Sequence, residues 1–181
     1  SNGIVEIQNS TFENNSAARF GGAINNNEGN LTLNKLELLS NNAPQGGGIY
    51  STNSVTFEGT TNLGSDITTL GEQTYSGTVN LQTDTQLTGT NLTFNGTVNG
   101  NKTLTLNPSG ATTFNESVAI GSLISQGNLN INADTITTTG NQSYLGQVKV
   151  TANTTLSANQ ITFSAPVSSS NFASLTLQPN T

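Results

Sequence analysis

The sequence predicts an all-β protein, a parallel β-helix (β-solenoid) of roughly eight coils. Three observations predict this fold: a phrase that recurs near the start of the chain, short runs of alternating apolar and polar residues, and a duplication that matches the chain from Ile67 with the chain from Ile136. Repeats at spacings of roughly 20 to 50 residues are typical of solenoids, in which successive coils stack. Helices are disfavoured because Asn, Gly and Thr interrupt every candidate amphipathic window.

The recurring phrase is "FENNSAARFGGAI", which returns as "LLSNNAPQGGGI". Phe12 has a counterpart in Leu38, Asn15 in Asn41, and Ile24 in Ile49, each at the spacing of a solenoid repeat. In a coil, we expect Phe12 to fill the core, Asn15 to cap a turn, and Gly21 with Gly22 to let the chain turn tightly before Ile24 re-enters the core. A structural role is therefore favoured for the phrase over a role in ligand contact.

The strands are expected where short runs alternate between apolar and polar residues and are bounded by Asn, Gly, Ser or Pro. In chain order, the apolar residues of these runs are Leu31, Leu33, Leu36, Leu38; Val55, Phe57; Val79, Leu81; Leu92, Phe94; Leu104, Leu106; Leu129, Ile131; Val148, Val150; Ile161, Phe163; and Leu175, Leu177. Phe94 and Phe114 follow Thr in the same way. Their spacing predicts that they occupy equivalent places in neighbouring coils.

The duplicated units are residues 67–108 and 136–179. They align without a gap from Ile67 and Ile136, and after a two-residue insertion "LTLNP" meets "LTLQP". Identical pairs include Gly71 and Gly140, Gln73 and Gln142, Tyr75 and Tyr144, Leu87 and Leu156, and Phe94 and Phe163. With coils of roughly 20 to 25 residues, the offset between the two copies predicts about three coils.

One β-helical body, residues 1–181, is expected, with phrase-bearing coils in 1–54 and Thr/Asn-rich coils in 55–181. The competing fold is an antiparallel β-sandwich, in which the Asn-Gly pairs at Asn2, Asn95 and Asn99 form hairpin turns. Because the chain starts at Ser1 and contains no Met, we expect a fragment of a longer protein. No apolar run approaches the roughly 20 residues of a membrane-spanning helix.

Charged residues are scarce, at 8% of the chain against about 25% in an average domain. The net charge is -6, and the only cations are Arg19, Lys35, Lys102 and Lys149, which excludes a basic nucleic-acid-binding patch. The chain has no His and no Cys, so it lacks the usual general base, thiolate nucleophile and zinc ligands. We expect no catalytic residue, no metal and no cofactor.

Two other functions remain open as alternatives. A carbohydrate-active β-helix enzyme would need two or three carboxylates that converge in one groove, whereas the ten carboxylates are isolated in sequence. An ice-binding β-solenoid would need a regular plane of Thr. The Thr-x-Thr pairs are unevenly spaced, at Thr83/Thr85, Thr88/Thr90, Thr103/Thr105 and Thr135/Thr137.

The motifs Phe-x-x-Asn and Gly-Gly-Ala-Ile, in Phe12–Asn15 and Gly21–Ile24, resemble the repeat of the chlamydial polymorphic outer-membrane proteins. Leu38–Ile49 resembles a degenerate second copy. From Val55 onward, the Thr/Asn-rich runs resemble the repeats of filamentous-haemagglutinin-type exoproteins and autotransporter passengers. These resemblances imply a right-handed parallel β-helix that is exported across an outer membrane and lies on the bacterial cell surface or is secreted.

The predicted function is that of a structural and adhesive segment that mediates host-cell or intercellular adhesion. Its partners would be a host-cell receptor or a neighbouring bacterial surface protein, with self-association as an open alternative. Contact with a membrane would come only through other parts of the parent chain. The predicted motif residues are Phe12, Asn15, Gly21, Gly22, Ala23, Ile24, Asn41, Gly47, Gly48 and Ile49. The longest irregular segments are expected at Asn25–Asn30 and Gly59–Gly71, and the candidate adhesive loop is Asn25, Asn26, Asn27, Glu28, Gly29 and Asn30.

Overall fold

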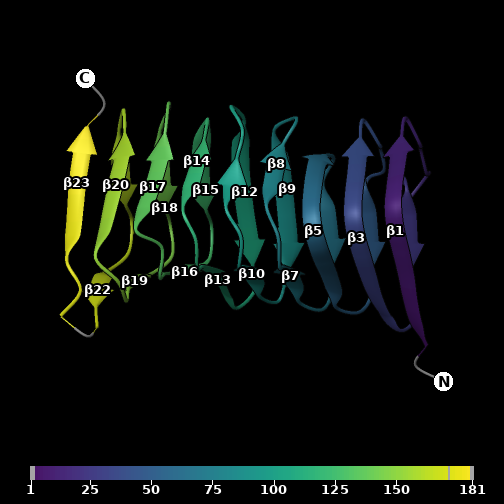
Figure 1. The fold of residues 1–181 in the computed structure, drawn as a ribbon, viewed down its shortest axis with the longest axis horizontal. Coiled ribbons are helices and arrows are strands. Elements are labelled where there is room, and N and C mark those ends of the chain that lie inside the picture. Colours follow the sequence, from purple (N-terminus) through teal and green to yellow (C-terminus); the bar gives the residue numbers. More distant parts are fainter. Residues whose placement is uncertain (1–2, 171, 180–181) are drawn as a thin grey trace.

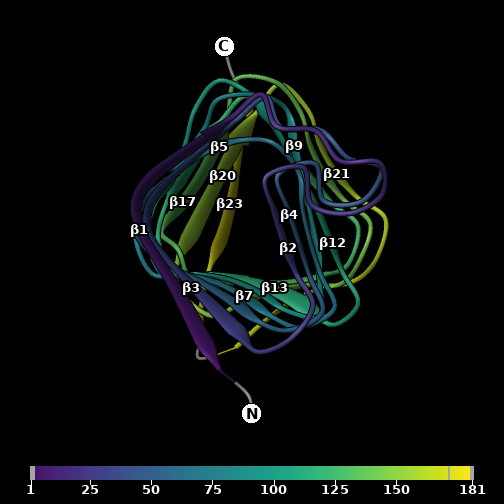
Figure 2. The ribbon, with the colours of Figure 1, turned by 90° about the vertical axis from the view of Figure 1, so that its right-hand side faces the viewer.

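The computed structural model describes residues 3–170 and 172–179, which form a rod of stacked coils (Figure 1). The paired strands of both sheets run parallel. In Figure 2, which looks along the rod from its N-terminal end, the chain turns clockwise as it recedes, so the coil is right-handed. The predicted parallel β-helix is confirmed and the antiparallel sandwich is wrong. Asn95 lies in a corner between strands and Asn99 ends a strand that pairs in parallel, so neither forms a hairpin turn; Asn2 lies outside the described residues.

Three long strands in the first three coils supply two faces of the rod each. They are β1 (Ile4–Glu13), β3 (Asn30–Leu39) and β5 (Val55–Gly64). Each bends at one residue with positive φ, at Asn9 (49°), Lys35 (52°) and Gly59 (66°). From the fourth coil on, separate short strands occupy these two faces.

The short strands form three faces. The first face contains β7 (Gln73–Tyr75), β10 (Leu92–Phe94), β13 (Ala111–Phe114), β16 (Asn128–Ile131), β19 (Val148–Val150) and β22 (Val167–Ser169). The second contains β8 (Val79–Leu81), β11 (Val98–Asn99), β14 (Val118–Ile120), β17 (Thr135–Thr138), β20 (Thr154–Ala158) and β23 (Leu175–Pro179). The third contains β2 (Ile24–Asn26), β4 (Ile49–Ser51), β6 (Ile67–Thr69), β9 (Thr85–Gly89), β12 (Thr103–Pro108), β15 (Ser122–Ser125), β18 (Gln142–Tyr144) and β21 (Ile161–Phe163). The first two faces join through β5 into one sheet, and the third face is a separate sheet with one strand from each coil.

The core is a narrow column of Leu, Val, Ile and aromatic side chains. Four rings stack along the first face: their centroids are 4.5 Å apart for Phe57 and Tyr75, 4.7 Å for Tyr75 and Phe94, and 5.0 Å for Phe94 and Phe114. Phe94 pairs with Phe114 across one coil, as their spacing predicts. Each such ring contact contributes about 0.5–1.5 kcal/mol beyond the burial of apolar area.

Coil length changes along the rod. The first two coils are the longest, because Ile4 pairs with Asn30 and Leu31 pairs with Val55. The next two are shorter by about a quarter, because Val55 pairs with Gln73 and Gln73 pairs with Leu92. These later coils fall below the length predicted from the recurring phrase, since their corners contain few residues.

The two copies of the duplication lie on different faces. Ile67 is in β6 of the third face, whereas its counterpart Ile136 is in β17 of the second. Likewise Tyr75 is on the first face and Tyr144 on the third. The second copy begins eleven strands after the first, and a coil from the fourth onward contains three strands. The offset therefore spans three coils and two thirds of a fourth, not the three coils predicted.

The two segments predicted to be irregular are mostly strands. Asn25 and Asn26 belong to β2, and β3 begins at Asn30, so only residues 27–29 connect them. In residues 59–71, β5 and β6 leave little room for a loop. The long connections are instead residues 14–23 and 40–48, inside the recurring phrase itself. This prediction was wrong because a Gly-Gly pair indicates a tight turn and says nothing about the length of chain before it.

Candidate functional site

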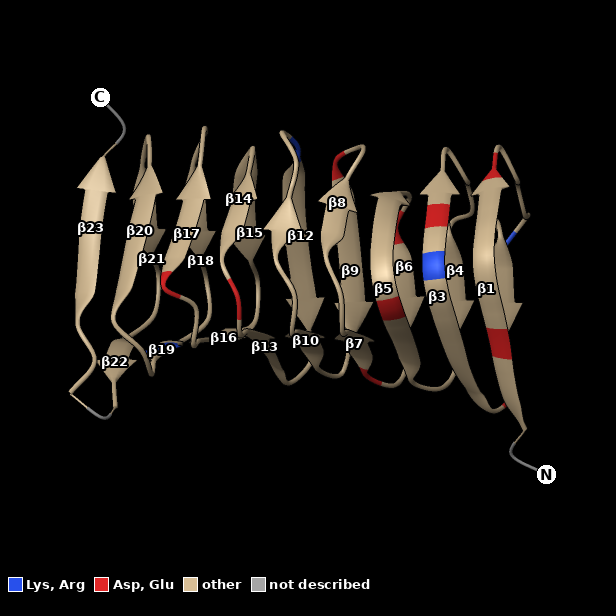
Figure 3. Cartoon of the chain, viewed as in Figure 1, with Lys and Arg blue, Asp and Glu red and all other residues tan. Residues whose placement is uncertain are grey.

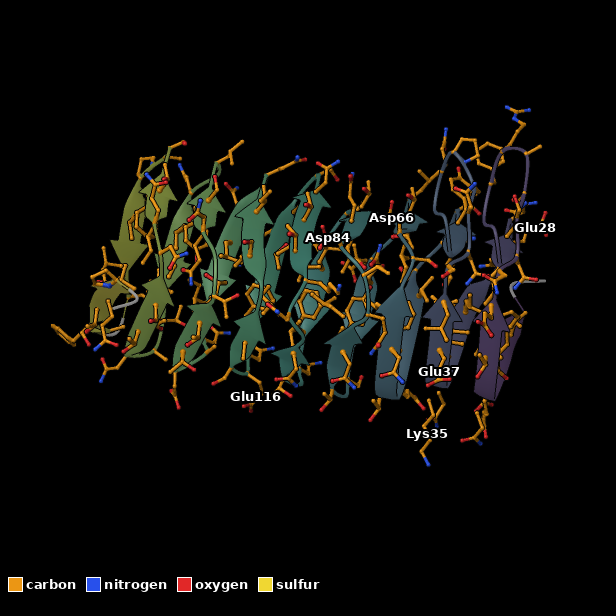
Figure 4. The ribbon with its side chains drawn as sticks, turned by 90° about the horizontal axis from the view of Figure 1, so that it is seen from above. Glu28, Lys35, Glu37, Asp66, Asp84 and Glu116 are labelled. Carbon is orange, nitrogen blue, oxygen red and sulfur yellow. The ribbon has the colours of Figure 1, made fainter. Side chains whose placement is uncertain are left out.

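Residues 14–23 and 40–48 form a projection that we call the crest. They connect β1 to β2 and β3 to β4, and they project sideways from the rod near its N-terminal end (Figures 2 and 4). The two segments stack as the coils do, through backbone hydrogen bonds from Ala17 N to Asn42 O (3.0 Å), Gln45 N to Arg19 O (3.1 Å) and Gly21 N to Gln45 O (3.0 Å). The crest is thus an ordered extension of the β-helix.

The Asn residues of the motif hold the base of the crest. Asn41 Oδ1 accepts hydrogen bonds from the backbone N (3.0 Å) and the Nδ2 (2.9 Å) of Asn15. Asn41 also donates from Nδ2 to Phe12 O (2.8 Å), and its backbone N donates to Ser65 Oγ (2.9 Å). Asn41 is buried, and these bonds give partners to its side-chain amide in the first coil and to its backbone N–H in the third. The predicted turn-capping position is therefore a stacked amide bridge.

Gly21 and Gly22 are required where the crest returns to the rod. Gly21 has a φ of +54°, and a Cβ there would lie 1.9 Å from Ile24 O. A Cβ on Gly22 would lie 2.2 Å from Gly47 O. The counterpart of Gly21 is Gly46, with a φ of +59°. Gly46 was missed at the level of the sequence, although Gly21 and Gly46 have the same spacing as the paired Ile24 and Ile49.

The other motif residues enter or flank the core. Phe12 pairs with Leu38, and Ile24 with Ile49, as predicted. Ile49 is fully buried, whereas Phe12 and Ile24 are half-buried because they belong to the first coil and have a neighbouring coil on one side only. Ala23 also packs against the core, and its counterpart is Gly48. A Cβ on Gly48 would approach Ser65 Cβ to 3.0 Å.

The crest presents an aromatic and a cationic side chain. The guanidinium carbon of Arg19, the only Arg of the chain, lies 5.1 Å from the ring centroid of Phe20. Phe20 packs on Tyr50 of β4, with the ring centroids 4.5 Å apart. Arg19 is exposed and Phe20 half-buried. Arg and aromatic side chains are common anchors of protein interfaces.

A polar groove runs beside the crest along the third face. Residues 43–46 of the crest, with Asp66, Thr68, Gln86 and Thr88, line a hollow of about 160 Å³. A second hollow of about 260 Å³ shares Asp66 and Gln86 and extends to Asp84, Thr103 and Thr105. Figure 4 shows Asp66 and Asp84 next to one another beside the crest. We refer to the two hollows together as the groove.

Both carboxylates of the groove hold the backbone of the next coil. Asp66 Oδ1 accepts a hydrogen bond from Gln86 N (2.7 Å), and Asp84 Oδ1 from Thr103 N (2.8 Å). Each therefore has a structural role. Eight of the ten acidic residues precede Thr85, so the negative charge gathers in the coils that carry the groove (Figure 3).

The predicted adhesive loop, Asn25–Asn30, lies at the opposite end of β2 from the crest. Asn26 Nδ2 donates to Gly29 O and to Ser51 Oγ, both at 2.9 Å, and closes a tight corner. Asn27 and Glu28 are exposed there. The segment is a corner and not an insertion, and its adhesive role stays a prediction.

Within residues 3–170 and 172–179, no group of three or more His, Cys, Asp or Glu side chains is arranged to hold a metal ion. Nor does any helix in this part of the chain have the length and apolar character to cross a membrane. Comparison with known proteins finds no matching family, no matching curated protein and no matching solved structure.

Proposed function

We propose that the chain is a structural and adhesive segment of an exported bacterial surface protein of the autotransporter type, and that the crest is its adhesive surface. The observation that carries this proposal is the way in which the recurring phrase is used. Its Asn and Gly residues build a projection that presents the exposed Arg19 against Phe20, whose ring packs on Tyr50 of β4. The likeness of the phrase to the chlamydial polymorphic outer-membrane protein repeat supports the same proposal.

The proposed mechanism is geometric. Parallel strands with an aliphatic and aromatic core make a stiff rod whose coils contact their nearest neighbours. The crest meets a host-cell receptor or a neighbouring bacterial surface protein, and the rod sets its distance from the bacterial surface. We propose no catalytic step for this segment.

The test is a cell-adhesion assay with purified protein coated on beads. An Arg19→Ala/Phe20→Ala variant is expected to lose most of the adhesion of the original protein. Arg19→Glu provides a variant that keeps Phe20 on Tyr50 and so preserves that packing. Leu145→Ala is the matched control, because Leu145 is an exposed large side chain (47%) far from the crest.

Circular dichroism establishes that each variant is folded. If the original protein fails to bind cells, or if both crest variants bind as well as Leu145→Ala, the crest is not an adhesive surface. An Asn27→Ala/Glu28→Ala variant tests the corner predicted from the sequence. Loss of adhesion in that variant alone would place the adhesive surface at residues 25–30.

Ice binding is a second candidate that one observation favours. Five Thr side chains stack in one row on the outside of the first face: Thr32, Thr56, Thr74, Thr93 and Thr113. The Thr-x-Thr pairs of the sequence do not form such a plane, since Thr85 is buried. Measurement of thermal hysteresis decides this candidate: ice binding requires activity that Thr74→Lys/Thr93→Lys abolishes, and an inactive original protein rules it out.

A further inference from the structure

The hydrogen bond that each groove carboxylate makes recurs along the rod. In five corners, a side-chain Oδ1 accepts a hydrogen bond from the backbone N–H of a residue in the next coil. The acceptors and donors are Asp66 and Gln86, Asp84 and Thr103, Asn91 and Ala111, Asn128 and Gln147, and Asn153 and Ser174. Three of the five acceptors are Asn, so an amide oxygen is sufficient for this bond.

The duplication makes the comparison direct. Asn153 is the counterpart of Asp84 in the second copy, and it makes the same contact at 3.0 Å that Asp84 makes at 2.8 Å. The hydrogen bond is kept in the second copy and the charge is not. Stacking of the coils therefore does not account for a carboxylate at position 84. Among these five corners, the two with a carboxylate are the two that line the groove.

The other polar side chains in the groove carry hydroxyls or amides. Thr103, Thr105 and Gln86 line the hollow that holds both carboxylates, and Thr68 and Thr88 line the hollow under the crest. Neither hollow is lined by Lys or Arg. Hydroxyls both donate and accept hydrogen bonds, and carboxylates accept strong, charge-assisted ones. Such a set of groups fits a ligand that is rich in hydroxyl groups and carries no negative charge.

We infer that the groove binds a neutral oligosaccharide, with the carboxylate oxygens of Asp66 and Asp84 accepting hydrogen bonds from its hydroxyl groups. The Oδ1 atoms are held by the backbone of the next coil, which fixes the orientation of both carboxylates before a ligand arrives. Neither Oδ2 has a hydrogen-bond partner in the part of the chain that the structure describes. This inference rests on the proposed adhesive function and assigns it a chemical class of partner.

The test uses isothermal titration calorimetry with three neutral probes: a β-linked N-acetylglucosamine hexamer, an α-linked glucose hexamer and a mannose hexamer. A sulfated heparin hexamer is the anionic comparison. Asp66→Asn/Asp84→Asn keeps the hydrogen bond to the next coil, as Asn153 shows, and removes the charge. Glu116→Gln is the matched control, since Glu116 lies on the opposite edge of the rod from the groove (Figure 4).

We expect at least one neutral hexamer to bind, Asp66→Asn/Asp84→Asn to weaken its Kd at least tenfold, and Glu116→Gln to leave it unchanged. The inference is overturned if the folded protein binds none of the neutral hexamers, if it binds only the heparin hexamer, or if the double variant binds as tightly as the original. Adhesion separates this inference from the proposed function. If the crest variants lose cell adhesion but the protein binds no oligosaccharide, the inference about the groove is rejected and the proposed function stands. If the protein binds an oligosaccharide but does not adhere to cells, the proposed adhesive role of the crest is rejected and the inference about the groove stands.

Discussion

A buried Gln–Tyr pair provides a quantitative test of the core. Tyr75 donates its hydroxyl hydrogen bond to Gln73 Oε1 (2.7 Å), and Gln73 Nε2 donates to Thr88 O (2.8 Å). Gln73 and Tyr75 are fully buried. The duplicated pair repeats the arrangement: Tyr144 donates to Gln142 Oε1 (2.8 Å), and Gln142 Nε2 to Ser157 O (2.9 Å). The same network thus exists on the first face and on the third.

The perturbation is Tyr75→Phe, which removes the hydroxyl and keeps the ring between Phe57 and Phe94. Because Gln73 Oε1 then loses its partner in a buried site, we expect a loss of about 1–3 kcal/mol in the free energy of unfolding. Gln73→Leu leaves the hydroxyl of Tyr75 unpaired and also removes the donor to Thr88 O, so it is expected to cost at least as much. In the double variant neither group is left over, so its cost should be smaller than the sum of the two by about 1–2 kcal/mol.

Urea unfolding followed by circular dichroism measures the four proteins of this cycle, and constant m-values establish that the compared transitions are the same. Tyr50→Phe is the matched control, because no hydrogen bond to a described residue is lost with that hydroxyl, and it should change stability by less than about 0.5 kcal/mol. The reasoning is refuted if the costs of Tyr75→Phe and Gln73→Leu add to within about 0.5 kcal/mol of the double variant.

Three further predictions follow from single sites. Burial raises the pKa of the Tyr75 and Tyr144 hydroxyls, so above about pH 10 the unfolded chain releases protons that the folded protein keeps. Urea midpoints should therefore be unaffected by these groups below that pH and fall above it, less steeply in Tyr75→Phe; an equal fall in that variant contradicts the assignment. Gly22→Ala should loosen the crest and speed its proteolysis, while Gly3→Ala, with no atom within 4 Å of the added Cβ, should not; equal proteolysis would contradict this. Thr112→Val should raise stability by about 1–2 kcal/mol in urea unfolding, because the Thr112 hydroxyl is buried with no hydrogen-bond partner among the described residues; a loss would contradict this.

The parallel β-helix could be predicted because its inward positions are repeated in sequence. Phe94 and Phe114, or Phe12 and Leu38, are similar residues at one coil's spacing, and the structure pairs them. The shorter length of the later coils could not be predicted. It depends on the number of residues in each corner, which the alternation of apolar and polar residues in the strands does not specify.

The crest and the groove could not be predicted from the sequence, for a different reason. The positions of Asn15 and Gly21 in the phrase were recognised, but nothing in the residues between them indicates that the chain leaves the rod. Asp66 and Asp84 have no acidic neighbour close in sequence that would mark them as a pair. They line one hollow because a single coil separates them, and the length of that coil is known only from the structure.

The two copies of the duplication lie on different faces of the rod, and this shift affects inward-facing and outward-facing residues differently. Since the second copy is displaced by one face, its inward residues must suit two faces, and the Gln–Tyr pair does so. Its outward residues stand in new surroundings and cannot extend the rows of the first copy. The counterparts of Asp66 and Asp84 are Thr135 and Asn153, on the second face and its corner, where no crest overhangs them. Duplication therefore lengthened the rod without copying the groove, which is why we expect a binding surface in the N-terminal coils and a spacer in the rest.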